Sequence, residues 1–136
     1  MKSLARFWIG LMFVMMSGAG YAQVVSALPD EDETPVRMAE EAPEFPGGKD
    51  SLDAFVRREL VYPSIAMENN IQGVVLVEFI VEKDGRVTHG KVLASLFTDC
   101  DVEALRVVMS MPKWQPAKNQ GDPVRCYYMC PIRFRL

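Results

Sequence analysis

Residues 123–136, PVRCYYMCPIRFRL, decide the fold, because their side chains alternate along the whole stretch. The even positions hold only apolar residues, cysteines and a tyrosine, whereas the odd positions hold all three arginines. A period of two with one apolar side indicates a β-strand that buries one face. Pro131 lies inside this strand and has no N–H for a ladder, so we expect an edge strand. The unpaired backbone of such an edge can accept a strand from a partner.

The other end of the chain predicts export. Lys2 and Arg6 precede a short apolar run, residues 7–16, and Gly20 and Ala22 form a small-residue cleavage site. The run is shorter than the roughly 20 residues of a membrane span. Residues 1–22 are therefore predicted to be a cleaved signal peptide, which makes the protein periplasmic. An uncleaved anchor that faces the periplasm from the inner membrane is the alternative.

Residues 23–43 are predicted to be an acidic flexible linker, and residues 44–136 a single folded domain. Residues 23–45 contain seven acidic residues and one basic residue, Arg37. From Pro46 onward the chain has 12 basic and 11 acidic residues. This near balance argues against a nucleic-acid partner.

Helical spacing of apolar residues predicts a helix around residues 52–60, capped by Asp50 or Ser51. Pro63 is placed to open a second helix, residues 63–69, which Asn69 and Asn70 close. A third helix is expected over residues 100–111 with a cap at Thr98 or Asp99. Its buried stripe should contain Ala104, Leu105, Val108 and Met111.

Two strands precede the third helix. Residues 73–82 carry an unbroken apolar face, and Asp84-Gly85 indicates a hairpin to residues 86–94. The spacing of Val87 and Val92 requires a bulge near Gly90. The last strand returns through a helix, and antiparallel neighbours place it beside the first strand. The sequence thus predicts an α+β fold, with a three-stranded antiparallel sheet in the order 2-1-3 and helices packed on one face.

Residue types that carry chemistry are few. Cys126 and Cys130 share one strand face about 13 Å apart, too far for a disulfide, and we expect both to be buried. A disulfide from Cys100 to either one is left open. His89 is the single histidine, so neither a catalytic nor a metal site is predicted, and no cofactor. We expect no enzymatic activity.

Six motifs follow in order: Tyr62-Pro63, Ile71-Gln72-Gly73-Val74, Asp84-Gly85-Arg86-Val87, Asp101-x-x-Ala104-Leu105, Trp114-x-Pro116-Ala117 and Pro131-Ile132-x-Phe134-x-Leu136. Each motif alone is common, but their order and spacing resemble the carboxy-terminal domain of TonB. The preceding Glu44-Phe45-Pro46-Gly47-Gly48 resembles the form found in Bacteroidota.

This resemblance implies a function. The domain would capture the TonB box, a short peptide of outer-membrane receptors, by strand addition at its last strand. It would thereby link receptors to the inner-membrane proton-motive complex, directly or through another transducer. Transducers of this family have an anchor and a long proline-rich spacer, whereas 21 extended residues reach only about 70 Å.

The expected partner-binding residues follow from parity. Alternate N–H groups of a strand point to the same side, and Pro131 should occupy an outward position. The free outward donors are then Arg125, Tyr127, Met129, Arg133 and Arg135. The resemblance adds Tyr62 and Val61. At the position of Val61, directly before Tyr-Pro, enterobacterial members carry a polar side chain. An exported structural or regulatory protein that uses the same edge for another partner, or for a homodimer, is the alternative.

The first testable prediction concerns export. The exported protein should begin at Gln23, because signal peptidase cleaves after small residues such as Ala22. Intact-mass measurement of the periplasmic protein checks this. A mass that retains residues 1–22 would instead indicate a membrane-tethered protein.

Overall fold

The computed structural model describes residues 33–136, and the expected signal peptide lies outside this range. Glu33–Leu136 form one compact unit. Within the described residues, no helix combines the length and the apolar character needed to span a bilayer.

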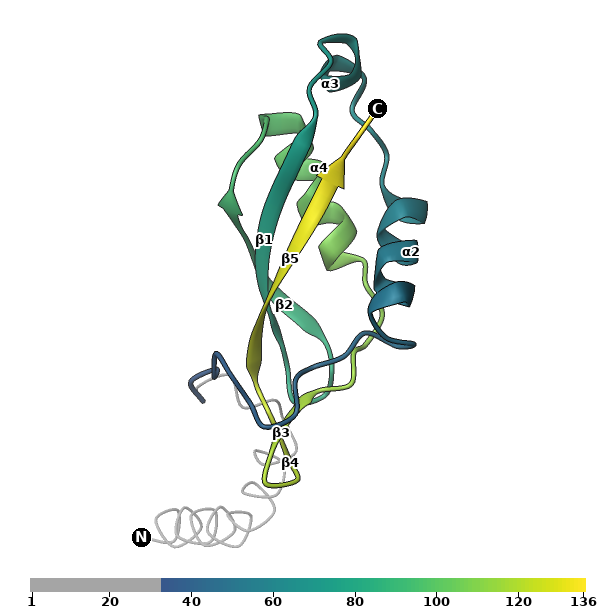
Figure 1. The fold of residues 1–136 in the computed structure, drawn as a ribbon. Helices are drawn as coiled ribbons and strands as arrows, with labels where there is room; N and C mark the ends of the chain where they lie inside the picture. Colours follow the sequence, from purple (N-terminus) through teal and green to yellow (C-terminus); the bar gives the residue numbers. More distant parts are fainter. Residues whose placement is uncertain (1–32) are drawn as a thin grey trace, which may run out of the picture. The chain divides into compact units, whose positions relative to one another are not determined.

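The sheet contains β1 (Gly73–Val81), β2 (Val87–Ala94) and β5 (Cys126–Phe134) in the order β2-β1-β5. Both pairings are antiparallel. The α+β fold, the antiparallel sheet and the predicted strand order are therefore confirmed. In Figure 1, β1 lies between its two partners and β5 carries the chain to its carboxy terminus.

The register between β1 and β5 runs without a bulge, from Gly73 opposite Phe134 to Val81 opposite Cys126. Pro131 lies opposite Leu76. The β1–β2 register is irregular between Glu78 and Ile80, next to Gly90 and the left-handed His89 (φ 56°). The bulge predicted near Gly90 is thus confirmed, and a second irregularity follows between Leu76 and Val77.

The helices are α2 (Lys49–Glu59), α3 (Ser64–Glu68) and α4 (Thr98–Met109). The expected side-chain caps of α2 and α4 are wrong: the cap positions hold Gly48 and Phe97, and neither makes a side-chain cap hydrogen bond. Pro63 directly precedes α3, which begins one position later than predicted. Gly48 has φ 90°, a backbone conformation that glycine adopts without strain and that starts α2 without a polar cap.

A small hairpin precedes β5. Its strands are β3 (Ala117–Asn119) and β4 (Asp122–Val124). Gln120 and Gly121 turn with positive φ. The last strand consequently starts at Cys126 instead of Pro123.

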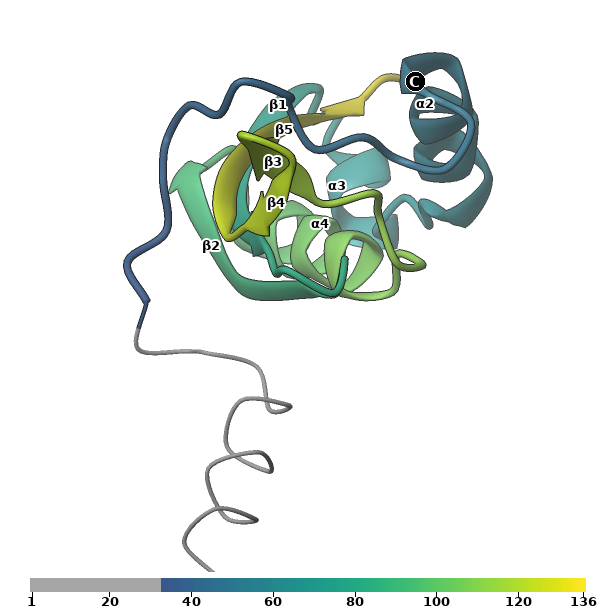
Figure 2. The same cartoon turned by 90° about the horizontal axis from the view of Figure 1, so that it is seen from below.

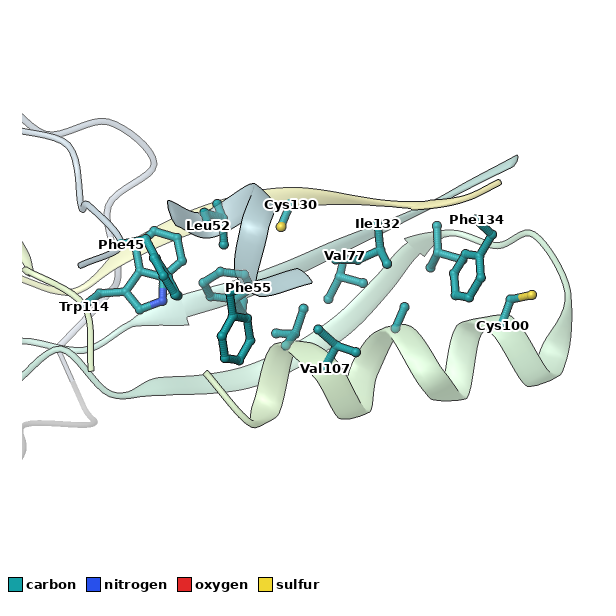
Figure 3. Packing of buried hydrophobic residues seen from close by; sticks show 14 of the residues in the cluster. Phe45, Leu52, Phe55, Val77, Cys100, Val107, Trp114, Cys130, Ile132 and Phe134 are labelled. Atoms are coloured by element: carbon teal, nitrogen blue, oxygen red, sulfur yellow. The ribbon is translucent and has the colours of Figure 1, made fainter. Parts of the chain in front are cut away.

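One hydrophobic core joins the helices to one face of the sheet (Figure 3). The odd-numbered apolar residues of β1, from Val75 to Val81, are fully buried there, as predicted. In α4, the predicted Ala104 and Val108 are buried together with Cys100 and Val107. The predicted Leu105 is only partly buried, and so is Met111, which lies beyond the end of α4. The helices therefore cover one face of the sheet, and the even-numbered residues of β1 lie on the other.

Trp114 closes the core at the end near the hairpin. Its ring centroid lies 5.4 Å from that of Phe79, 5.6 Å from Phe45 and 4.8 Å from Tyr128, and its side chain is 4% exposed. Edge-to-face aromatic packing of this kind stabilises a core beyond its buried area.

Truncation of this ring should be costly. Trp114→Ala removes three aromatic contacts, so we expect the free energy of unfolding in urea to fall by about 3–5 kcal/mol. Val102→Ala, at an exposed position of α4, is the matched control and should change it by less than about 0.5 kcal/mol. A loss below about 1 kcal/mol for Trp114→Ala contradicts the packing described here.

Candidate partner-binding edge

The outer side of β5 is the candidate site. Its odd-numbered side chains are exposed or half-buried and its even-numbered ones face the core, as the alternation predicts. Tyr127 donates its N–H away from β1, to a carbonyl outside the sheet, so the odd-numbered backbone groups point outward. Pro131 shares this parity. Its missing N–H therefore interrupts only the free side and leaves the ladder to β1 intact.

The first part of this edge is occupied by the chain itself. Val36 donates its N–H to the carbonyl of Arg125 and accepts the N–H of Tyr127, both at 2.9 Å, and lies parallel to β5. In Figure 1 the segment that precedes α2 passes the lower end of β5. The N–H of Tyr127 is therefore not an open donor, which corrects the expectation for this residue, and the carbonyl of Arg125 is occupied as well.

Residues 36–44 continue along the hairpin and do not extend into solvent as a linker. Glu41 exchanges two backbone hydrogen bonds with Lys118, and Glu44 does the same with Gln115. Seen from below, this segment runs on the side of β5 away from α4 (Figure 2). The compact unit thus includes residues before Glu44, the predicted start of the domain.

The side chain of Arg125 belongs to a buried ion pair. Its Nε lies 2.7 Å from Oε1 of Glu82, and both side chains are almost fully buried, at 4% and 3% exposure. Thr88 donates a hydrogen bond to the same carboxylate. Burial by itself raises the pKa of Glu82, but the hydrogen bonds from Arg125 and Thr88 and the charge of Arg125 outweigh it and bring the pKa below its ordinary value. This guanidinium is committed to the fold and is not available to a partner.

A second acid–base pair lies on the same face of the sheet, four residues earlier on β1. Nη1 of Arg37 lies 2.7 Å from Oε2 of Glu78, whose side chain is 11% exposed. The guanidinium of Arg37 also lies 4.2 Å from the ring centroid of Tyr127, as in a cation–π contact. The hydrogen bond to Glu78 and its charge raise the pKa of Arg37. Glu78 and Tyr127 thus form a binding site for a basic side chain.

The remainder of β5 is open. Met129 is 54% exposed, and Arg133 is also exposed. Among residues 33–136, no group donates to or accepts from the outward backbone of Met129 or Arg133. Arg135 follows the last residue of β5. Met129 to Arg133 is therefore the part of the edge to which a partner strand has access.

Tyr62 and Val61 lie at the far end of β5. The Tyr62 ring packs edge-on against Phe134, with centroids 5.6 Å apart, and its hydroxyl donates to the carbonyl of Ile71. Val61 is 65% exposed, and its N–H donates to Glu103. Tyr62 thus supports the last residue of β5 from the core side, while Val61 offers an apolar surface.

Three residues of this region were not expected from the sequence: Val36, Arg37 and Glu78. A signal was present for two of them. Arg37 is the single basic residue within an acidic stretch, and Glu78 interrupts an apolar strand. The contact between them joins residues 41 positions apart, which no local pattern reveals.

The cysteines are buried and reduced. Cys100, Cys126 and Cys130 are free thiols, so the disulfide left open for Cys100 is not formed. Burial raises the pKa of Cys130 to about 11, and it also raises the pKa of the other two. A thiol with a raised pKa is a poor nucleophile, so these residues act as small apolar side chains of the core.

The fold and this edge define a small α+β domain that presents part of an unpaired strand. A family model described as "Gram-negative bacterial TonB protein C-terminal" matches residues 58–136, more than half of the chain. The protein belongs to the TonB carboxy-terminal domain family, whose members are non-enzymatic periplasmic domains that interact with TonB-dependent receptors. Neither curated proteins nor solved structures gave a match.

The ion pair between Glu82 and Arg125 should make stability depend on pH. The pKa of Glu82 is lowered by folding, so its contribution is complete above the unfolded value near 4.5 and is lost as the pH falls through the folded value. Glu82→Gln leaves Arg125 without its buried counter-charge and should cost about 3–5 kcal/mol at pH 7. The difference from the wild type should shrink below pH 4.5.

Urea unfolding at pH 7 and at pH 3 measures both effects. Asp53→Asn, which breaks an exposed pair with Lys49, is the matched control and should cost less than about 0.5 kcal/mol. Equal costs for the two variants at pH 7 would mean that the Glu82 pair is solvated.

Proposed function

We propose that this protein is a periplasmic binding module that engages TonB-dependent outer-membrane receptors in energy-coupled transport. It captures the TonB box of the receptor by strand addition along the open part of β5. The observation that carries this proposal is the outward backbone of Met129 and Arg133, which has no partner within residues 33–136. Family membership supports the same class of partner.

Backbone pairing supplies affinity, and the exposed side chains supply selectivity. Met129 offers an apolar contact beside the edge, with Val74 exposed on the neighbouring strand at 43%. Arg133 and Arg135 place positive charge at the end of the strand. A peptide with an apolar centre and an acidic residue near this end complements the surface.

We further propose that the protein acts after export and cleavage at Ala22. Such a protein contacts the inner-membrane proton-motive complex through another transducer, because residues 23–43 would span only about 70 Å even if all were extended, and those from Val36 onward pair with the domain. The second candidate is a structural or regulatory exported protein that binds another partner or itself through the same edge. It is favoured by one observation, the pairing of Val36 with the first part of β5.

A pair of proline substitutions tests strand addition. Met129→Pro removes an outward N–H, so affinity for a synthetic peptide from the periplasmic end of a receptor should fall about tenfold, with a stability loss below about 1 kcal/mol. Tyr128→Pro removes an N–H that points to β1 and should destabilise the sheet by about 3 kcal/mol or more. Fluorescence titration and thermal melts of each variant give both quantities.

The two proline variants also test which backbone groups of β5 point outward. If Met129→Pro unfolds the domain while Tyr128→Pro is tolerated, the outward parity is assigned wrongly. If Met129→Pro folds and binds the peptide as tightly as the wild type, the peptide does not pair with this edge. Capture of outer-membrane receptors by the tagged full-length protein, with the Met129→Pro variant as control, extends the test to whole receptors.

A further inference from the structure

The first part of the β5 edge carries an inference that rests on the function proposed above. We propose that residues 33–37, termed here the strap, occupy in cis the place of a partner strand. The partner that displaces the strap carries a basic side chain, which takes the position of Arg37 between Glu78 and Tyr127. This assigns a charge preference to the partner.

The backbone of the strap already reproduces strand addition. Val36 makes the two hydrogen bonds that a residue of an added parallel strand makes, one to Arg125 and one from Tyr127. A partner that pairs with Met129 and Arg133 and continues along β5 reaches the same two groups. It cannot bind there until Val36 leaves, because each outward N–H has one strong acceptor.

The side-chain site explains why the partner should be basic. Glu78 is 8% exposed and lies on the open face of the sheet, where Arg37 is its ion-pair partner among the described residues. When the strap leaves, this carboxylate loses its counter-charge, which is unfavourable for an acid on a sheet face. A partner with arginine or lysine at the matching position restores the ion pair and the contact with the Tyr127 ring, whereas an acidic side chain is repelled.

The exposure of the strap favours its displacement by a partner. Arg37 itself is 67% exposed, and Met38 beyond it is 88% exposed. An ion pair with one exposed partner contributes only modestly to stability, and a partner can replace that contribution. From Glu40 onward the segment is held by Asn119 and by the backbone of Lys118, so the strap can leave while the remainder stays attached.

Glu33, at the amino end of the strap, makes two further contacts with the domain. The carboxylate of Glu33 lies 2.6 Å from Nζ of Lys83, and the carbonyl of Glu33 accepts a hydrogen bond from Nη1 of Arg125, also at 2.6 Å. Neither contact involves the outward backbone of β5. Displacement of Val36 and Arg37 exchanges two hydrogen bonds and an ion pair for equivalent ones from the partner, and displacement of the whole strap also breaks the two contacts of Glu33.

One neighbour competes with a basic partner. Lys91 lies opposite Glu78 in the β1–β2 register and is exposed. If Lys91 turned to Glu78 after the strap leaves, the carboxylate would be neutralised from within the domain. The experiment therefore has to measure the charge preference directly.

The full-length chain with Val36→Pro and Arg37→Ala is a strap-disabled variant, since it loses one backbone donor and the guanidinium. Its probes are two synthetic peptides: ETPVRMA, which repeats residues 33–39, and ETPVAMA, which has alanine in place of the arginine. We expect the arginine peptide to bind about tenfold more tightly in an NMR titration, and the wild-type chain to bind it more weakly than the strap-disabled variant.

A further substitution locates the preference. Glu78→Gln in the strap-disabled variant should reduce the difference between the two peptides to less than about threefold, whereas Glu41→Gln, the matched control, should leave it unchanged. Thermal melts show that each variant is folded. Equal affinities for the two peptides, or a preference that survives Glu78→Gln, overturn the inference.

A receptor peptide in the same titration separates this inference from the function on which it rests. If the receptor peptide binds and the strap peptides do not discriminate, the proposed function stands and the inference fails. If the wild-type chain and the strap-disabled variant bind neither the receptor peptide nor the strap peptides, both fail together.

Limited proteolysis tests the strap in the free protein. Trypsin cleaves after Arg37 only when this segment detaches, so Glu78→Gln should increase the initial rate of that cleavage at least about fivefold over the wild type. Glu41→Gln is again the control. A rate that does not change in Glu78→Gln means that Glu78 does not hold the strap, which contradicts the proposal.

Discussion

The one-sided pairing of β5 is the constraint on which the rest of the structure depends. β1 has a partner strand on both sides, so all its backbone groups can be satisfied within the sheet. β5 is paired with β1 without a bulge, and every second backbone group therefore points away from the domain. The core fixes this register, because a slip by one residue would expose Ile132 and Phe134 to water.

Charged residues on the open face reinforce the same register. Continuing the ladder by one pair places Arg125 opposite Glu82, and the ion pair forms at this position. Glu78, four residues earlier on β1, obtains its counter-charge from outside the sheet, from Arg37. A buried pair within the domain and a half-exposed pair with the strap thus have different roles. The first fixes the edge, and the second can be exchanged with a partner.

Much of the fold could be predicted because it depends on local patterns. Alternation identified β1 and β5, Asp84-Gly85 identified the hairpin, and the spacing of Val87 and Val92 required the bulge. The helix caps failed because Gly48 and Phe97 start helices through backbone geometry, which leaves no mark in side-chain chemistry. For the site, parity identified the outward positions of β5, but the strap depends on contacts between residues about 40 to 90 positions apart in the chain.

The most direct test of the central claim is amide hydrogen exchange, resolved by residue, in the full-length protein with and without a bound receptor peptide. If the partner adds a strand to β5, the outward amides of Met129 and Arg133 become protected, while those of Tyr128 and Cys130, already bonded to β1, change little. Protection confined to the helices, with Met129 and Arg133 still exchanging freely in the complex, would contradict strand addition at this edge.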